Sequence, residues 1–376
     1  MPDQTKIELG EEPQEEPQVP LEEKYREQMR QIISQKIELP ISTLPEMIDK
    51  QINLSPEFQR RDRWSVEKQS RFIESIIMNV PIPPVFLGED DYGNYVVLDG
   101  RQRLTAMYQF LKNAYVLKNL EVWKELNGLR FLDLEKRKLD RTITRRFVPA
   151  VVILKESSPE VKYDVFDRLN TGGVVANEME IRNAVYPGKF NRLIHRLSEI
   201  RQFRELWGIP TDDTARDEDA DYRTMRDVEL VLRFFALREP EAMDLAYKDY
   251  LSAFMGRRNK EYEKDGAVEQ ADEGVFRRAI ENCWKVFGAQ AFERKPGAKK
   301  SAPLADAMMT SLSMLKPDRV DSPLASRLKA NLDALLNDDV FQKVISSGTN
   351  GKGAIQTRIE MAKMAVRKAA PNHAFA

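Results

Sequence analysis

The chain has 376 residues, of which 42% are hydrophobic and 32% charged, so we expect two or three folded domains and exclude global disorder. The charges of its 59 basic and 60 acidic side chains nearly cancel, which excludes a positive field over the whole protein that would attract nucleic acid. Any contact with nucleic acid must therefore come from local basic patches. The single cysteine, Cys283, excludes an internal disulfide and a cysteine-based zinc site. The two histidines, His195 and His373, disfavour catalytic triads and histidine-rich metal sites.

Residues 1–36 are predicted to form an acidic disordered arm followed by a short helix. The glutamates and prolines over 11–17 cannot bury enough apolar surface to fold, and the helix is expected over 21–35. No secretory signal segment and no apolar run near about 18 residues occurs, so neither a signal peptide nor a membrane span is expected. With a single cysteine, the expected location is the reducing cytoplasm.

Residues 37–155 are predicted to form a compact α+β domain. Pro40 restricts the first strand to a sheet edge because proline cannot donate a hydrogen bond, whereas the last strand is apolar enough to be central. Ser65 is the expected N-cap of the longest helix. The predicted elements are a strand at 37–41, helices at 44–50 and from 66 to the prolines at 81–84, strands at 85–87 and 95–98, a helix after Asp99, and a strand at 147–154.

Residues 156–376 are predicted to be mainly helical. Asn177 and Glu180 have the spacing of a capping box, and residues 228–237 form a strongly apolar helix. The charged segment 256–273 is interpreted as a loop or an exposed helix. Arg145 and Arg146, in the preceding domain, are interpreted as structural salt-bridge residues.

The first candidate site is the junction Asp99-Gly100-Arg101-Gln102-Arg103, where an apolar strand passes into a helix. Gly100 would let a phosphate approach the helix start, and Arg103 could pair with phosphate oxygens in a bidentate manner. Asp99 could hold Mg²⁺ through one carboxylate while substrate phosphates complete the coordination shell. The alternative is an ordinary Asp-Gly turn in which Arg103 braces the carboxylate.

Two further segments supply candidate binding residues. Gln59, Arg60, Arg63 and Trp64 could form an anion clamp with a stacking face for a base. The alternative is a solvated basic turn with Trp64 in the core. Asn170, followed by Thr-Gly-Gly at a helix end, could place its amide over a ligand, although this sequence is also typical of a helix C-cap.

Together these segments resemble the N-terminal domain of GmrSD-type restriction endonucleases over residues 40–190. The family's usual Asp-Gly-Gln-Gln-Arg motif has Arg101 at its third position here. A more distant similarity to ParB and sulfiredoxin lies in the spacing of Glu74-Ser75-Ile76 before Pro83 and of Gly100-x-x-Arg103. The order of motifs that carries the GmrSD resemblance is Phe58-Gln59-Arg60 with Trp64, Ile73–Ile76, Pro81–Pro84, Asp99–Leu104 and Arg168–Gly173.

The resemblance implies a ParB/sulfiredoxin-like domain that binds a nucleoside triphosphate and Mg²⁺, with hydrolysis or a nucleotide switch that gates action on foreign DNA. By position, Asp99 and Arg103 would be the catalytic pair, with Asp99 as metal ligand. Many relatives carry a histidine-containing nuclease domain, and the two histidines of this chain are too few to form one. A separate nuclease or effector subunit is therefore an expected partner. The nucleotide pocket would be lined by Gln59, Arg60, Arg63, Gly100, Arg101, Gln102 and Asn170.

The leading hypothesis is therefore an NTP-binding and hydrolysing component of a prokaryotic anti-phage restriction system that acts on DNA and contacts no membrane. One alternative is a metal-dependent DNA nuclease that uses Asp99 with nearby carboxylates, namely Glu57, Asp62 and Glu74. Another is a non-enzymatic DNA-binding or nucleotide-sensing module. The preferred base and the formation of a homo-oligomer stay open.

Overall fold

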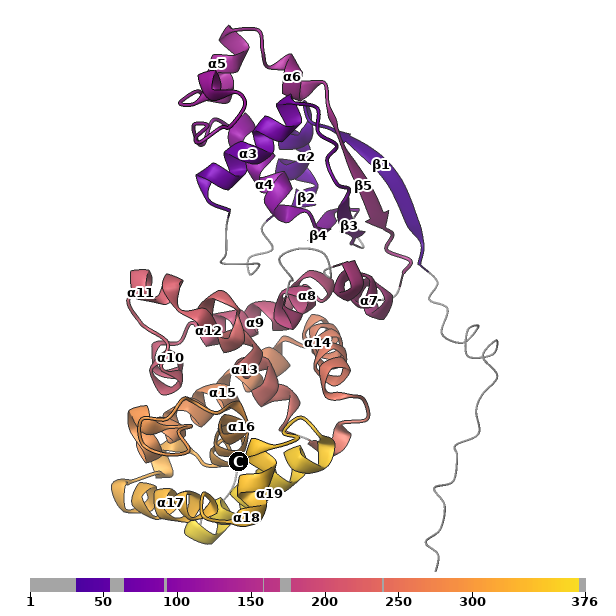
Figure 1. Cartoon of the computed structure of the whole chain (residues 1–376). Coiled ribbons are helices and arrows are strands. Elements are labelled where there is room, and N and C mark those ends of the chain that lie inside the picture. The colour runs from indigo at the N-terminus through magenta and orange to yellow at the C-terminus, as the bar shows by residue number, and fades with distance from the viewer. Residues whose placement is uncertain are drawn as a thin grey trace, which may run out of the picture.

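The computed structural model describes residues 32–54, 64–90, 93–157, 159–169, 177–238 and 240–371, which form two parts (Figure 1). A five-stranded mixed sheet and its covering helices come first, and the rest of the described chain is helical. The expected α+β character and the helical C-terminal region are confirmed, whereas the ParB/sulfiredoxin likeness stays a prediction. None of the described helices is both long and apolar enough to cross a membrane.

The sheet has the strand order β1-β5-β3-β4-β2. β1 is antiparallel to β5 at one edge, and the short β2 is parallel to β4 at the other. β3 lies between them, parallel to β5 and antiparallel to β4. The expected edge strand and central strand are thus confirmed, whereas the last two residues of the helix expected over 21–35 belong to β1 instead. The strands are β1 (Ser34–Pro40), β2 (Ile52–Asn53), β3 (Val85–Glu89), β4 (Tyr95–Asp99) and β5 (Phe147–Ile153).

Helices α2 (Leu44–Lys50), α3 (Val66–Ile77) and α4 (Arg101–Leu111) cover one face of the sheet (Figure 1). The Ser65 hydroxyl accepts the N–H of Lys68 at 3.4 Å, which confirms the expected N-cap of α3. Strand residues that alternate along the sheet meet the apolar sides of these helices. The connection from α4 to β5 contains η1 (Lys124–Leu126), α5 (Phe131–Lys136) and α6 (Arg141–Thr144).

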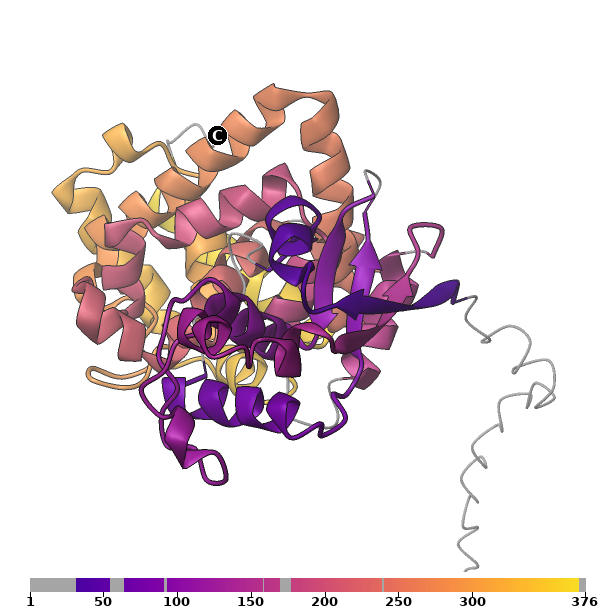
Figure 2. The ribbon, with the colours of Figure 1, turned by 90° about the horizontal axis from the view of Figure 1, so that it is seen from above.

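The opposite face of the sheet packs on α7 (Pro159–Leu169) and α8 (Glu178–Val185). Leu98 and Ile153 belong to the same buried cluster as the apolar side chains of the C-terminal helices. This face of the sheet therefore packs into the apolar core of the helical region, whereas the other face forms a separate core with α2, α3 and α4. Seen from above, the sheet and its helices lie over only part of the helical region, and α14 and α15 extend beyond them (Figure 2).

The helical region confirms the local signals in the sequence. Asn177 and Glu180 exchange hydrogen bonds of 2.9 and 2.8 Å as a capping box, and residues 256–273 are helical on both sides of Asp265. The helices are α9 (Lys189–Ser198), α10 (Arg201–Trp207), α11 (Asp213–Glu218), α12 (Ala220–Arg223), α13 (Arg226–Ala236), η3 (Pro240–Ala242), α14 (Tyr247–Lys264), α15 (Gly266–Phe287), η4 (Gly288–Gln290), α16 (Ala302–Leu312), η5 (Pro317–Arg319), α17 (Ser322–Leu335), α18 (Asp339–Ser346) and α19 (Lys352–Ala369).

A buried ion triad joins three of these helices. Asp306 of α16, 3% exposed, accepts hydrogen bonds of 3.1 and 2.6 Å from Arg233 of α13 and of 2.7 Å from Arg358 of α19. Burial alone would raise the pKa of Asp306, but the two guanidinium groups outweigh it and hold this pKa below its ordinary value. The two arginines thus supply hydrogen-bond donors to both oxygens of the Asp306 carboxylate inside the apolar core.

Glu74, buried in α3, fixes a loop on the outside of the sheet domain. Its carboxylate accepts the backbone N–H groups of Glu121 at 3.2 Å and of Val122 and Trp123 at 2.8 Å. Burial would raise the pKa of Glu74, but these hydrogen bonds and the nearby charge of Arg71 lower it below its ordinary value. Glu74, considered from the sequence as a nuclease ligand, therefore has a structural role.

Glu74→Gln is expected to lower the free energy of unfolding by about 1–3 kcal/mol at neutral pH, because an amide removes one charged acceptor from backbone donors. Since the folded-state pKa of Glu74 is depressed, its contribution is present above the unfolded pKa of about 4.3 and is lost as the pH falls through the folded value. Urea denaturation at several pH values measures both effects. Glu46→Gln, in an exposed pair with Lys50, is the control, and an equal loss there would contradict this assignment.

Candidate functional site

The candidate site lies where β4 passes into α4. Asp99 is the last residue of β4, and Gly100 has the left-handed conformation φ 92°, ψ 9° directly before α4. A Cβ atom at Gly100 would lie 2.4 Å from Cγ1 of the buried Val85 on β3. Both the conformation and the space therefore require glycine here. The tight turn brings the carboxylate of Asp99 next to the first turn of α4.

Arg103 is held in place by groups on both sides of this junction. One guanidinium nitrogen is 2.6 Å from Oδ2 of Asp99, and the other donates to the carbonyl oxygens of Pro83 and, at 3.3 Å, of Pro84. The Arg103 side chain is 13% exposed, whereas that of Asp99 is 42% exposed. This ion pair is the one expected from the sequence if the segment were an ordinary Asp-Gly turn and not a phosphate-binding site. It fixes Arg103 and leaves Asp99 accessible to solvent.

Gln102 connects the junction to the second candidate segment. Its Oε1 accepts the backbone N–H of Trp64 at 3.1 Å, and the Trp64 carbonyl accepts Nε2 of Gln69 at 3.1 Å. The Trp64 ring packs edge-on against Phe72 with centroids 5.7 Å apart, which is a structural role. Trp64 is therefore fixed beside the first turn of α4.

Three of the predicted nucleotide-binding residues, Gln59, Arg60 and Arg63, lie outside the described residues, as do Glu57 and Asp62. The described chain on either side of them contacts β4 and α4. Before them, β2 pairs in parallel with β4, so Ile52 and Asn53 run in the same direction as the strand that ends at Asp99. After them, the described chain begins again at Trp64, the residue that follows Arg63, and its backbone N–H contacts Gln102.

Asn170 also lies outside the described residues. It directly follows α7, and the seven residues 170–176 separate Leu169, the end of α7, from Asn177, the N-cap of α8. Both helices pack against β4. Of the candidate residues, the structure describes Trp64 and the junction residues Asp99, Gly100, Arg101, Gln102 and Arg103.

Across the described ranges, no group of three or more histidine, cysteine, aspartate or glutamate side chains is arranged to hold a metal ion. Among the described residues of the junction, Asp99 supplies the one carboxylate, and its Oδ2 also accepts a hydrogen bond from Arg103. Such a set fits Mg²⁺ only when phosphate oxygens and water supply the other ligands, as they do for a nucleotide-bound ion.

Comparison with known protein families gives a match for the part of the chain that contains this junction. Residues 41–187 match the model of the GmrSD restriction endonuclease, N-terminal domain. Residues 41–187 are therefore similar to the GmrSD N-terminal domain family. No match was found among curated proteins, and none among solved structures.

The limits of this match fit the packing of the elements. The match begins after β1 and ends just before α9, so it includes both α7 and α8 on the second face of the sheet. The helices that pack on β4 are thus part of the same domain as the Asp99 junction. The helical region from α9 onward lies beyond the match.

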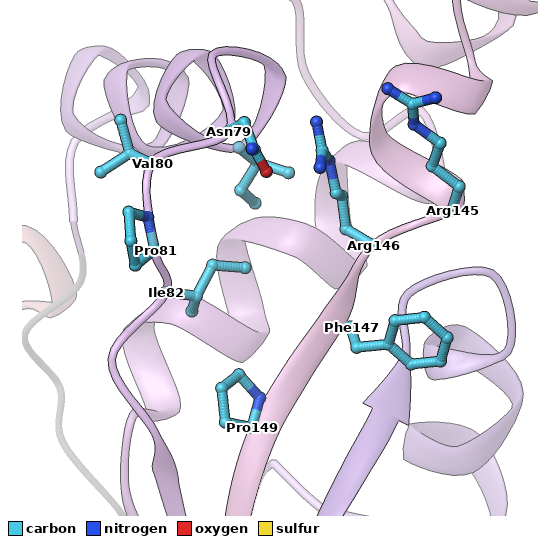
Figure 3. A pocket seen from close by; sticks show the side chains of 9 residues that line it. Asn79, Val80, Pro81, Ile82, Arg145, Arg146, Phe147 and Pro149 are labelled. Atoms are coloured by element: carbon cyan, nitrogen blue, oxygen red, sulfur yellow. The ribbon is translucent and has the colours of Figure 1, made fainter.

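The domain of residues 41–187 also has a pocket of about 340 Å³ that was not expected from the sequence (Figure 3). Arg145 and Arg146, interpreted from the sequence as salt-bridge residues, line it and form no ion pair within the described ranges. A signal was present in the sequence, since Arg145-Arg146-Phe147 places two cations and an aromatic ring at the start of a strand. The other lining residues are Ile76, Asn79, Val80, Pro81, Ile82 and Pro149.

Proposed function

We propose that the domain of residues 41–187 binds and hydrolyses a nucleoside triphosphate at the carboxyl end of β4, within a restriction or anti-phage defence system that acts on DNA. The observation that carries the proposal is the junction itself. A solvent-accessible carboxylate, a glycine that cannot be replaced without a clash, and an immobilised arginine meet at the start of one helix.

The residues have distinct roles in this proposal. Gly100 lets the phosphates approach the first turn of α4, whose N–H groups point away from the helix and favour an anion. Arg103 stabilises negative charge on the phosphates, and its bonds to Asp99 and Pro84 hold it ready before the nucleotide arrives. Asp99 orients the water that attacks the terminal phosphorus, which breaks the bond to the bridging oxygen and releases phosphate and the diphosphate.

Mg²⁺ fits this proposal as an ion that arrives with the nucleotide and neutralises phosphate charge. The Asp99 carboxylate would be its protein ligand. The remaining nucleotide contacts come from the family resemblance, which assigns them to Gln59, Arg60, Arg63, Arg101, Gln102 and Asn170.

The family description supports DNA as the target, because the domain is named for a restriction endonuclease. With two histidines in the whole chain, a histidine-containing nuclease domain is not available within it. We propose that a separate nuclease or effector subunit cleaves the DNA and that this domain controls it through nucleotide hydrolysis.

The test is phosphate release by the purified chain with each of the four common NTPs and Mg²⁺, with and without DNA. Asp99→Asn keeps the size of the side chain and an acceptor for Arg103, and it is expected to reduce turnover by about 100-fold. Asp49→Asn, in an exposed pair with Lys112, is the matched control and should keep full turnover. Full activity of the Asp99 variant, or no turnover by the wild type with any NTP, would overturn the assignment.

A metal-dependent nuclease is the second candidate, favoured by the same family description. It predicts that the pure chain degrades plasmid DNA with Mg²⁺ and without a nucleotide. Cleavage that is lost in Asp99→Asn, with no phosphate release from any NTP, would favour this candidate over the first.

A further inference from the structure

The pocket beside Pro81–Pro84 has an unusual combination of charge and apolar wall. Its lining includes two arginines and no carboxylate. Neither Arg145 nor Arg146 has a side-chain hydrogen bond or ion pair to any residue that the structure describes, and Nε of Arg146 is buried without a partner. Two guanidinium groups without counter-charges favour an anionic ligand at this position.

The rest of the pocket suits a flat, partly apolar group. Figure 3 shows Asn79 to Ile82 on one side and Arg145 to Phe147 on the other, with the guanidinium group of Arg146 opposite Asn79. Val80 is 48% and Phe147 52% exposed, so apolar surface is open to solvent at the rim. The Asn79 amide can both donate and accept hydrogen bonds.

We infer that this pocket binds an unstacked nucleotide of a DNA strand. The phosphate would lie against Arg145 and Arg146, the base against Ile82 and Phe147, with the Asn79 amide at its edge. Arginine contacts to phosphate and aromatic contacts to bases are the two components of single-strand binding. A volume of about 340 Å³ is at the lower end for small-ligand sites and admits one nucleotide rather than a duplex.

The inference rests on the proposed action on DNA but not on nucleotide hydrolysis. The pocket is lined by the last turn of α3, the segment that follows it and the start of β5, whereas the hydrolytic residues Asp99 and Arg103 belong to β4 and α4. Binding of a strand and turnover of an NTP can therefore fail separately. The pocket would give the domain its contact with DNA, and the junction would give it the nucleotide switch.

The test is fluorescence anisotropy of an end-labelled single-stranded oligonucleotide with the full chain, without NTP or Mg²⁺. The double variant Arg145→Ala/Arg146→Ala is expected to weaken binding about tenfold or more and to lower the salt slope by about 1.4, the value for two lost phosphate contacts on a single strand. Phe147→Ala, which changes an exposed side chain, is expected to weaken binding about fivefold or more.

The matched control is Arg137→Ala/Arg141→Ala, which removes the same charge from two exposed positions outside the pocket. Equal weakening in the control would overturn the site and indicate general charge attraction. Tight binding of a free mononucleotide with no added affinity for the strand would also overturn it, as would unchanged strand binding in Phe147→Ala. Phosphate release in the same variants should stay at the wild-type level if the junction works independently.

Discussion

Asp306→Ala is expected to lower the free energy of unfolding by about 3–5 kcal/mol, because it leaves two buried guanidinium groups without their shared carboxylate. Arg358 is fully buried and Arg233 nearly so, and both donate to Asp306 at 2.7 Å or less. The triad joins α13, α16 and α19, so the loss falls on the core of the helical region. Since a domain is stable by only about 5–15 kcal/mol, this one substitution removes much of that margin.

Urea denaturation followed by far-UV circular dichroism measures the effect as a lower midpoint. Asp333→Ala is the matched control, because Asp333 forms a comparably short pair with Lys329 at the surface, where both side chains are more than 40% exposed. That change should cost about 1 kcal/mol or less. Similar midpoints for the two variants would show that burial does not decide the contribution of the triad.

Gly100→Ala is expected to lower the free energy of unfolding by about 2–4 kcal/mol, which combines backbone strain with overpacking. The new methyl group would meet the buried Val85 at 2.4 Å, and alanine rarely adopts φ 92°. Phosphate release should fall as well, because any relaxation moves Asp99 relative to the first turn of α4. Chemical denaturation and the NTP assay measure the two effects.

Gly128→Ala separates strain from overpacking. Gly128 has φ 84°, close to that of Gly100, but a Cβ there would meet nothing within 4 Å. Its substitution should therefore show only the cost of the left-handed conformation, about 1 kcal/mol. If the two glycine variants were equally stable, contact with Val85 would not be the reason for glycine at the junction.

The sequence predicted the elements whose signals are local. The helix at 44–50, the Ser65 cap and the Asn177–Glu180 capping box depend on residues within one or two turns, and all three are present. The Asp99 junction could be located for the same reason, since a strand, a glycine and a helix follow one another directly. The edge position of β1 followed from a single proline.

What could not be predicted depends on contacts between distant parts of the chain. Glu74 appeared to be an available carboxylate, and only the folded chain brings the backbone of residues 121–123 onto it. Arg145 and Arg146 appeared to be salt-bridge residues because the sequence does not show which side chains lie opposite them. The pocket exists only because the end of α3 and the start of β5, far apart in the sequence, lie side by side.

The pairing of β1 with β5 determines how this domain can be cut from the chain. The family match begins at Ile41, after β1, yet β1 pairs with β5 along its whole length, from Ser34 opposite Ile153 to Pro40 opposite Phe147. A fragment that starts at the family boundary would leave the apolar strand β5 with an unpaired edge. Such edges recruit strands from other molecules, so a fragment for expression should begin before Ser34 to avoid aggregation.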